Sequence, residues 1–180
     1  MRKVIMGIGI PASGKTTILR EFAQKYGYDY IGLDDLRLEI YGKIEYETSP
    51  ENEEWKKRNK ETWEEVKKRV QESLLMDNTV VLDATFSTRR KRKDFLKFIR
   101  ENGAEKIQGI YVDTPEEIAR ERNLKRERIV PEEIVDKIVS EKEEPKIEEG
   151  FDGIFTVDEY QNLVQAEIVR GEGSLKKEFK

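Results

Sequence analysis

The chain has 180 residues, of which 40% are charged, and its 34 basic and 38 acidic side chains leave a formal net charge of −4. This length is typical of one domain that buries about 70% of the surface of its unfolded chain. The near balance of charge excludes a strong overall field toward a polyanion. Cysteine and histidine are absent, which excludes disulfides, thiol nucleophiles, histidine bases and ordinary zinc sites. Any general base must therefore be a carboxylate.

No apolar run approaches the length that spans a membrane, and the first residues predict a core strand rather than a signal peptide. We therefore expect a soluble, cytoplasmic protein. The charge density, the absence of cysteine and the scarcity of asparagine and glutamine are typical of a thermophilic source.

Residues 9–16 read Gly-Ile-Pro-Ala-Ser-Gly-Lys-Thr, a complete G-x-x-x-x-G-K-[ST] phosphate-binding loop. The apolar run 3–8 before it predicts a strand. Apolar residues at helical spacing over 17–26 predict a helix, which Gly27 ends as a C-terminal cap. This context of strand, glycine-rich loop and helix makes the loop a predicted site rather than a plain turn.

Glycines allow backbone N–H groups to surround phosphate oxygens, and the helix N-terminus adds partial positive charge. Lys15 can reach the β- and γ-phosphates, and the Thr16 hydroxyl is placed to bind Mg²⁺. We therefore expect ATP and Mg²⁺ here, with Thr16 as the metal ligand. The expected nucleotide-binding residues of this segment are Gly9, Pro11, Ala12, Ser13, Gly14, Lys15, Thr16 and Thr17.

A second strand is predicted over 28–33, and it ends at Asp34-Asp35 before a short helix over 35–41. Ligands of open α/β sheets bind at the carboxyl ends of strands, so a carboxylate here could face the γ-phosphate. Asp34 could equally cap the short helix. The spacing leaves both interpretations open.

A long helix is predicted to open at residues 49–51, with Ser49 as its N-cap and Pro50 in its first turn. Trp63, Val66, Val70 and Leu74 form its apolar stripe. Tryptophans on a basic helix can stack nucleobases, but Trp63 lies in the stripe and Trp55 lies on nearly the same face. We therefore expect both to be packed.

A short buried strand is predicted over 79–83, ending in Asp83, as the second acidic motif of phosphate-loop enzymes does. Ser87 or Thr88 then caps a helix that continues to 102–103 and begins with five consecutive bases, 89–93. These bases could form a solvated helix face or contact an acceptor phosphate. Both interpretations stay open.

A fourth strand is predicted over 106–112, followed by a capping box at 114–117. The next helix is expected to reach Val130, which puts Arg122 and Arg126 four residues apart on one face. Such a pair suits a lid that clamps the β- and γ-phosphates. Pairing with nearby glutamates is the alternative, and we favour the lid.

Residues 131–142 predict an amphipathic helix, 141–149 a solvated acidic connector and 153–157 a fifth strand. Residues 163–169 suggest one more strand, and the last ten residues a mobile tail. The alternation predicts a three-layer α/β fold of the P-loop NTPase type. We expect a mostly parallel five-stranded sheet with helices on both faces and a helical lid. The expected domain spans 1–160, with the lid at about 118–131, and 161–180 form a partly mobile strand or tail.

Together these stretches resemble the kinase domain of phage-type polynucleotide kinase and of the eukaryotic polynucleotide kinase–phosphatases. The resemblance extends to about residue 145 and returns at 148–152. It rests on the loop, on Asp34-Asp35-Leu36-Arg37, on Asp83 and on Arg122-Asn123-x-Lys125-Arg126. It implies that Asp34 is the general base on an acceptor 5′-hydroxyl and that Arg37 holds the acceptor's 3′-phosphate. It also implies that Asp83 helps to position the acceptor and Arg37, and that Arg126, supported by Arg122, binds the transferring phosphates.

Lys15, Asp34 and Arg126 are therefore the expected catalytic residues. Asp34, Arg37, Asp83, Thr85, Arg89 and Arg90 are the expected substrate contacts. The family's D-T-N after the third strand is Asp83-Ala84-Thr85 here, which removes a small polar group beside the acceptor. No D-x-D-x-T phosphatase motif occurs, so no phosphatase domain is expected.

The expected activity is ATP-dependent phosphorylation of the 5′-hydroxyl end of DNA or RNA. Related enzymes phosphorylate sugars, antibiotics, nucleotide sugars or aminoacyl-tRNA, so a small-molecule or tRNA-linked kinase is the nearest alternative. A nucleotide-dependent switch module that acts through a partner ranks third. The sequence leaves open DNA against RNA and the oligomeric state.

Overall fold

The computed structural model describes residues 1–46 and 52–169, which alternate between strands and helices. The strands are β1 (Lys3–Ile8), β2 (Asp29–Gly32), β3 (Val80–Asp83), β4 (Lys106–Val112), β5 (Gly153–Val157) and β6 (Leu163–Ile168). The helices are α1 (Lys15–Tyr26), α2 (Leu33–Tyr41), α3 (Glu53–Leu75), α4 (Arg89–Glu101), α5 (Glu116–Leu124), α6 (Glu132–Glu141) and the short 3₁₀ helix η1 (Ile147–Glu149).

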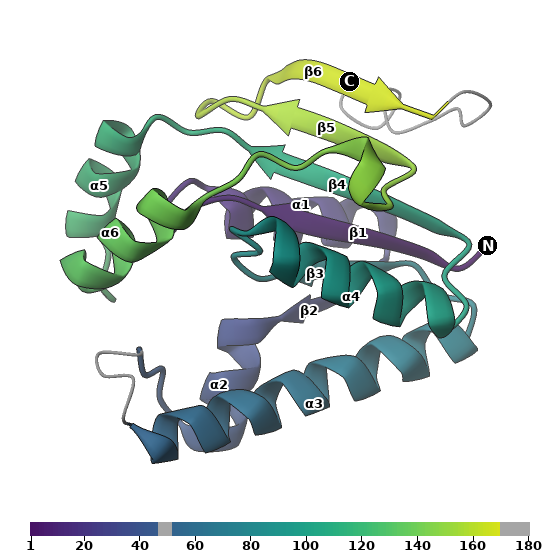
Figure 1. Cartoon of the computed structure of the whole chain (residues 1–180), viewed down its shortest axis with the longest axis horizontal. Coiled ribbons are helices and arrows are strands. Elements are labelled where there is room, and N and C mark those ends of the chain that lie inside the picture. The colour runs from purple at the N-terminus through teal and green to yellow at the C-terminus, as the bar shows by residue number, and fades with distance from the viewer. Residues whose placement is uncertain (47–51, 170–180) are drawn as a thin grey trace.

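The strands form one sheet in the order β2-β3-β1-β4-β5-β6. The first five of these are parallel, and β6 pairs antiparallel with β5. The predicted α/β class is confirmed, with six strands in the described chain instead of five, because the run suggested as one more strand joins the edge. All carboxyl ends of the parallel strands lie on the left in Figure 1, beside α5 and α6.

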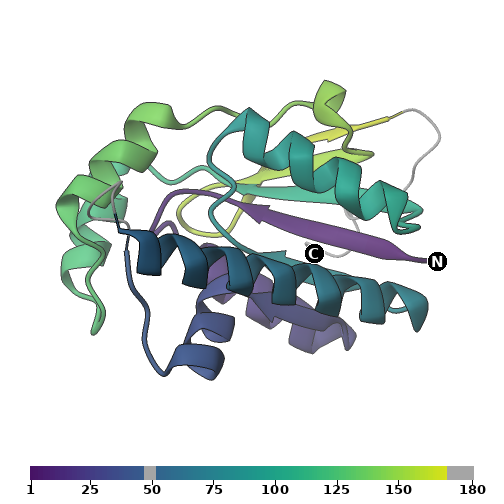
Figure 2. The same cartoon turned by 60° about the horizontal axis from the view of Figure 1, so that its bottom comes forward.

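Helices cover both faces of the sheet, as predicted. Alternate β1 residues point to opposite sides. Val4, Met6 and Ile8 join a core with residues of α3 and α4, whereas Ile5 packs with residues of α1. Figures 1 and 2 show α4 and α1 on opposite sides of the strands. The predicted α3 stripe is confirmed, since Val66, Val70 and Leu74 are at most 1% exposed.

Gly7 lets α1 approach β1 closely, just before the phosphate loop. A Cβ atom at this position would lie 2.2 Å from Leu19 Cδ1. A side chain here would push α1 away from the strand. The glycine therefore helps to place the helix N-terminus at the end of β1.

Two helix starts differ from the sequence prediction. Helix α2 begins two residues earlier, at Leu33, with Gly32 as its N-cap, so Asp34 lies inside the first turn and makes no capping hydrogen bond. Helix α3 begins at Glu53, where the Asn52 side chain accepts a hydrogen bond from Trp55 N at 2.9 Å. The predicted cap at Ser49 and Pro50 lies outside the described residues, as does the predicted tail over 171–180.

The predicted capping box at 114–117 is wrong. Helix α5 begins at Glu116 with the extended Pro115 (ψ 138°) as its N-cap. The buried Thr114 hydroxyl instead donates to the carbonyl oxygen of Ser13 at 2.8 Å. A tertiary contact to the phosphate loop has taken the side chain that local sequence assigns to the helix.

The connector after α6 is not uniformly solvated, which corrects that prediction. Glu149 pairs with Arg92 of α4, and neither side chain is exposed (0% each). Arg92 also donates to the carbonyl oxygens of Phe86, Glu143 and Glu144. The connector is therefore fastened to α4 and to the loop after β3.

In the part of the chain that the structure describes, no helix combines the length and the apolar character needed to cross a membrane.

Candidate active site

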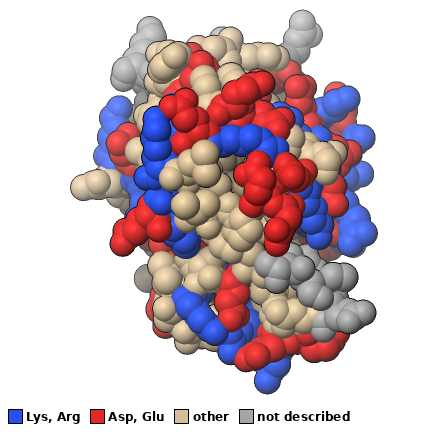
Figure 3. Space-filling model, turned by 90° about the vertical axis from the view of Figure 1, so that its left-hand side faces the viewer, with Lys and Arg blue, Asp and Glu red and all other residues tan. Residues whose placement is uncertain are grey.

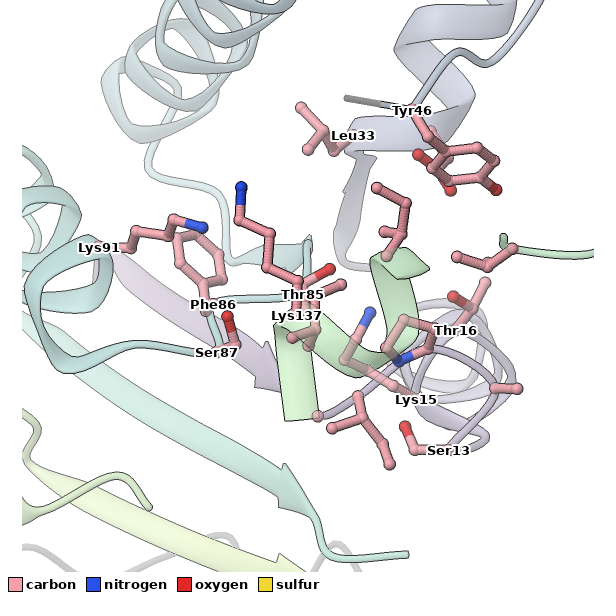
Figure 4. A pocket seen from close by; sticks show the side chains of 18 of the residues that line it. Ser13, Lys15, Thr16, Leu33, Tyr46, Thr85, Phe86, Ser87, Lys91 and Lys137 are labelled. Carbon is pink, nitrogen blue, oxygen red and sulfur yellow. The ribbon is translucent and has the colours of Figure 1, made fainter. Parts of the chain in front are cut away.

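A cavity of about 700 Å³ opens at the carboxyl edge of the sheet. The phosphate loop forms one wall, and residues of α2, α3, α4 and α6 form the others. In Figure 4, Lys91 and Phe86 lie at one end, Tyr46 lies at the other, and Lys15 projects between them. Of the predicted site residues, the cavity is lined by Gly9, Pro11, Ala12, Ser13, Gly14, Lys15, Thr16, Thr17, Asp34, Arg37, Thr85, Arg122 and Arg126.

The phosphate loop curls through two left-handed residues, Ala12 (φ 61°) and Gly14 (φ 97°). Glycine adopts this conformation without strain, and Gly14 leads directly into α1. Among the described atoms, the buried hydroxyl of Ser13 has no hydrogen-bond partner. An unpaired buried donor beside a helix N-terminus fits an anionic oxygen such as that of a phosphate.

Asp83, at the end of β3, collects three donors. Lys15 Nζ pairs with Oδ1, while Thr16 Oγ1 and Tyr30 Oη donate to Oδ2 at 2.6 and 2.8 Å. Strands β1 and β3 are neighbours in the sheet, so the loop after β1 meets the carboxylate that ends β3. The predicted second acidic motif therefore lies against the phosphate loop.

This environment keeps the Asp83 carboxylate charged. Burial raises its pKa, but the charge of Lys15 and the hydrogen bonds from Lys15, Thr16 and Tyr30 outweigh burial, so the pKa is lowered overall. For the Tyr30 hydroxyl, burial first and the Asp83 charge second raise the pKa far above the ordinary value. Tyr30 therefore stays protonated and acts as a donor.

Thr16 Oγ1 and the Asp83 carboxylate fit a magnesium ion, because both are hard oxygen donors and they lie within 2.6 Å of each other. Magnesium usually completes its shell with water and phosphate oxygens, so one or two protein ligands are sufficient. The magnesium ion expected from the phosphate loop is thus compatible with these residues.

Asp34 also lines the cavity, where two arginines hold it. Arg37 Nη1 donates to Oδ1 at 2.9 Å and Arg128 Nη2 donates to Oδ2 at 2.8 Å. Arg37 is itself oriented by Asn59, which accepts from its Nη2 at 2.8 Å. Each carboxylate oxygen has two lone pairs, so Asp34 can still accept a further hydrogen bond. The first helical turn thus aims this carboxylate at the cavity.

The two predicted lid arginines line the cavity but do not share a helix face. Helix α5 ends at Leu124, so Arg126 belongs to the irregular segment beyond it. Arg122 donates to the carbonyl oxygens of Ser13 at 3.2 Å and Glu159 at 2.8 Å. Arg126 lines the cavity, and within residues 1–46 and 52–169 its side chain makes no hydrogen bond or ion pair.

The basic run divides among three environments. Arg89 and Arg90 are exposed and do not line the cavity, Lys91 lines it, and Arg92 is fully buried. The helical period explains this split, because successive residues of α4 turn by about 100° each. Lys91, and not the predicted Arg89 or Arg90, is therefore the base of this run that lines the cavity.

Both tryptophans contact protein, as predicted. The Trp63 ring packs against Phe86 and Phe95, with centroid distances of 5.7 and 5.6 Å. Trp55 is half-buried, and its indole N–H donates to the carbonyl oxygen of Glu45 at 3.2 Å. Both tryptophans also line the cavity.

Sequence reasoning missed Tyr30, Asn59 and Arg128 as parts of the site. Each belongs to no phosphate-loop motif, and each acts through a residue that is distant in sequence. The only available signal was for Arg128, which lies in the basic segment of the predicted lid.

The face of the molecule on the left of Figure 1 carries interspersed acidic and basic side chains (Figure 3).

The fold, the loop and the paired acidic residue define an α/β P-loop protein of the NTPase type. The sequence matches the AAA domain family AAA_33 over residues 4–145, which is most of the chain. The chain belongs to this family. A comparison with curated proteins gave no match.

Solved structures share the fold. A candidate kinase from Chloroflexus aurantiacus J-10-fl gives a TM-score of 0.70 at 16% identity, covering 87% of this chain and 85% of that one. A gluconokinase from Sinorhizobium meliloti 1021 gives 0.57 at 20% identity, covering 89% and 83%. A chain of the Pnkp1/Rnl/Hen1 RNA repair complex gives 0.66 at 25% identity, covering 78% of this chain and 43% of its own.

Proposed function

We propose that this protein transfers the γ-phosphoryl group of ATP to the 5′-hydroxyl end of DNA or RNA. The observation that carries the proposal is the Asp34–Arg37 pair, which lines the same cavity as Lys15. A carboxylate beside a fixed cation can bind a hydroxyl whose neighbouring group is anionic. In a nucleic acid, that neighbouring group is the 3′-phosphate of the first nucleotide.

In this proposal Asp34 accepts the proton of the acceptor hydroxyl. The acceptor oxygen bonds to the γ-phosphorus while the bond between that phosphorus and the β,γ-bridging oxygen breaks, which releases ADP. Lys15 and Arg126 stabilise the negative charge that spreads over the phosphoryl oxygens. A magnesium ion held by Thr16 and Asp83 would supply further charge neutralisation. Arg122 braces the loop through Ser13.

Two features of the cavity support a nucleic-acid acceptor. Beyond the Asp34–Arg37 pair, Lys91 and Lys137 add positive charge to its lining, and the half-buried Trp55 and Trp63 add aromatic surface. Lysine side chains attract phosphates, and nucleobases stack on aromatic rings. The 25% identity to a chain of an RNA repair complex agrees with this acceptor class.

We take residues 1–160 as the catalytic domain, with the segment over 118–131 as its lid. The contact from Arg128 to Asp34 supports this assignment, because it links the segment after α5 to the proposed base.

A small anionic alcohol is the second candidate acceptor. The cavity is walled on several sides, the surface around it carries both signs of charge (Figure 3), and Arg37 could equally bind a carboxylate. A fold shared with a gluconokinase agrees with this possibility.

Salt dependence of the acceptor KM tests the proposal. For a 5′-hydroxyl oligonucleotide, binding should weaken with salt at a log–log slope of about −0.7 for each phosphate contact. We expect a slope that steepens from a nucleoside 3′-monophosphate to a tetranucleotide. Gluconate serves as the matched small anion. Turnover with gluconate and none with either nucleotide acceptor would contradict the proposal.

A further inference from the structure

Tyr30 joins two neighbouring strands at the phosphate loop. Strand β2 pairs in parallel with β3, with Gly32 beside Asp83. The half-buried Tyr30 side chain extends along this edge, and its hydroxyl donates to Asp83 Oδ2 at 2.8 Å. The same oxygen accepts from Thr16 Oγ1 at 2.6 Å, so two neutral donors share one carboxylate oxygen.

The Tyr30 ring is held in place from its outer side. The Arg20 guanidinium lies 5.3 Å from the ring centroid, and Arg20 in turn pairs with Asp35. A cation over an aromatic face is attracted to it. Helix α1 and the start of α2 therefore fix the direction in which the hydroxyl points.

Among the residues that the structure describes, Asp83 has one charged partner, Lys15, and a bound nucleotide needs the same lysine. Lys15 pairs with Asp83 in the structure, whereas the lysine of a phosphate loop reaches the β- and γ-phosphates of a bound nucleotide. Once Lys15 turns to the phosphates, and as long as no magnesium ion is bound, Asp83 is a carboxylate only 6% exposed that has lost its cation. A buried charge without compensating hydrogen bonds is costly.

We propose that Tyr30 is a positioning residue that holds Asp83 when Lys15 is transferred from this carboxylate to the nucleotide phosphates. The Tyr30 hydroxyl stabilises Asp83 both while Lys15 is paired with it and after Lys15 has moved to the phosphates. It contributes more after the move, because Asp83 then has fewer donors. Without it, Asp83 retains Lys15 more strongly and the nucleotide binds less tightly. The inference rests on nucleotide binding at the loop and holds whatever the acceptor is.

Equilibrium binding of ATP to Tyr30→Phe tests this role, measured with EDTA so that no magnesium ion binds Asp83. We expect the affinity for ATP to fall about tenfold, since a hydrogen bond to a charged group is lost mainly from the bound form. The acceptor KM should stay unchanged. Tyr41→Phe is the matched control, because Tyr41 Oη also donates to a carboxylate, Glu61 Oε2 at 2.7 Å, away from the cavity. It should bind ATP as the wild type does.

The Lys15→Ala background distinguishes an effect that depends on movement of the Lys15 side chain from a general disturbance of the site by Tyr30→Phe. Without Lys15, Asp83 has the same partners before and after binding, so adding Tyr30→Phe should change ATP affinity less than twofold. A tenfold loss in both backgrounds, or no loss in either, would overturn the proposal.

Arg20→Gln is a second variant that keeps the hydroxyl and alters only an exposed side chain. It should lower ATP affinity in the same direction but by less, with circular dichroism showing an intact fold. Wild-type affinity in a folded Tyr30→Phe protein contradicts the role directly. Should Tyr30→Phe not fold, wild-type affinity in Arg20→Gln contradicts it instead.

Discussion

Asp83 is the residue on which the phosphate-loop contacts converge. Its place after a buried strand could be predicted, because the apolar run before it ends there. The identity of its third donor could not be predicted. Tyr30 reaches Asp83 only because β2 and β3 are neighbours, and strand order in a sheet is not written in local sequence. Motif spacing therefore located the carboxylate, and the topology supplied its environment.

The stability of the protein should depend on the charge of Asp83 at acid pH. Its pKa in the folded chain lies below the ordinary 3.8, so its stabilising effect is complete above that value and is lost as the pH falls through the lowered pKa. Asp83→Asn should reduce the free energy of unfolding by about 3 kcal/mol at neutral pH, because it leaves Lys15, whose side chain is only 11% exposed, without its charged partner. Below about pH 4 the difference should shrink.

Urea unfolding across this pH range measures both effects. Asp77→Asn is the control, because the Asp77 side chain is 68% exposed and surface substitutions change stability little. A difference between wild type and Asp83→Asn that stays constant down to pH 2–3 would show that the carboxylate gains nothing from its charge.

At the scale of helices and loops, predictions that rested on apolar periodicity were confirmed. Predictions failed where a side chain contacts a group that is distant in sequence. The α3 stripe is an example of the first kind. Thr114 is an example of the second, since its hydroxyl meets the Ser13 carbonyl rather than the start of α5. Arg92 is another, because a run of five bases gives no sign that one of them pairs with Glu149 inside the protein.

The Arg92–Glu149 pair should be a main fastening of the connector that follows α6. Glu149→Ala leaves a guanidinium buried without its anion, which typically costs about 3–5 kcal/mol. Thermal or denaturant unfolding should show a large loss of stability. Glu148→Ala changes the exposed neighbour in the same 3₁₀ turn and should lie within about 0.5 kcal/mol of wild type.

Equal stability of Glu148→Ala and Glu149→Ala would contradict the fastening role. Because Arg92 also donates to the carbonyl oxygen of Phe86, a loosened connector is expected to disturb the cavity wall as well.

For the molecule as a whole, the order of strands and helices predicted the fold class well. Parallel strands need crossover connections, which are usually helices. These helices cover both faces of the sheet, so the apolar strands are buried on both sides. The antiparallel edge strand β6 was harder to assign, because half-exposed edge strands carry a weaker pattern than central ones. The acceptor was harder still, since it depends on how α2, α3, α4 and α6 close one cavity.

Phosphoryl transfer from γ-labelled ATP to a short 5′-hydroxyl oligonucleotide tests the proposed function most directly. We predict label on the hydroxyl strand, none on an identical strand that already carries a 5′-phosphate, and loss of transfer in Asp34→Asn with ATP binding retained. The acceptor and the base would then be established together. No label on either strand from a protein that binds ATP, or full transfer by Asp34→Asn, would contradict the account.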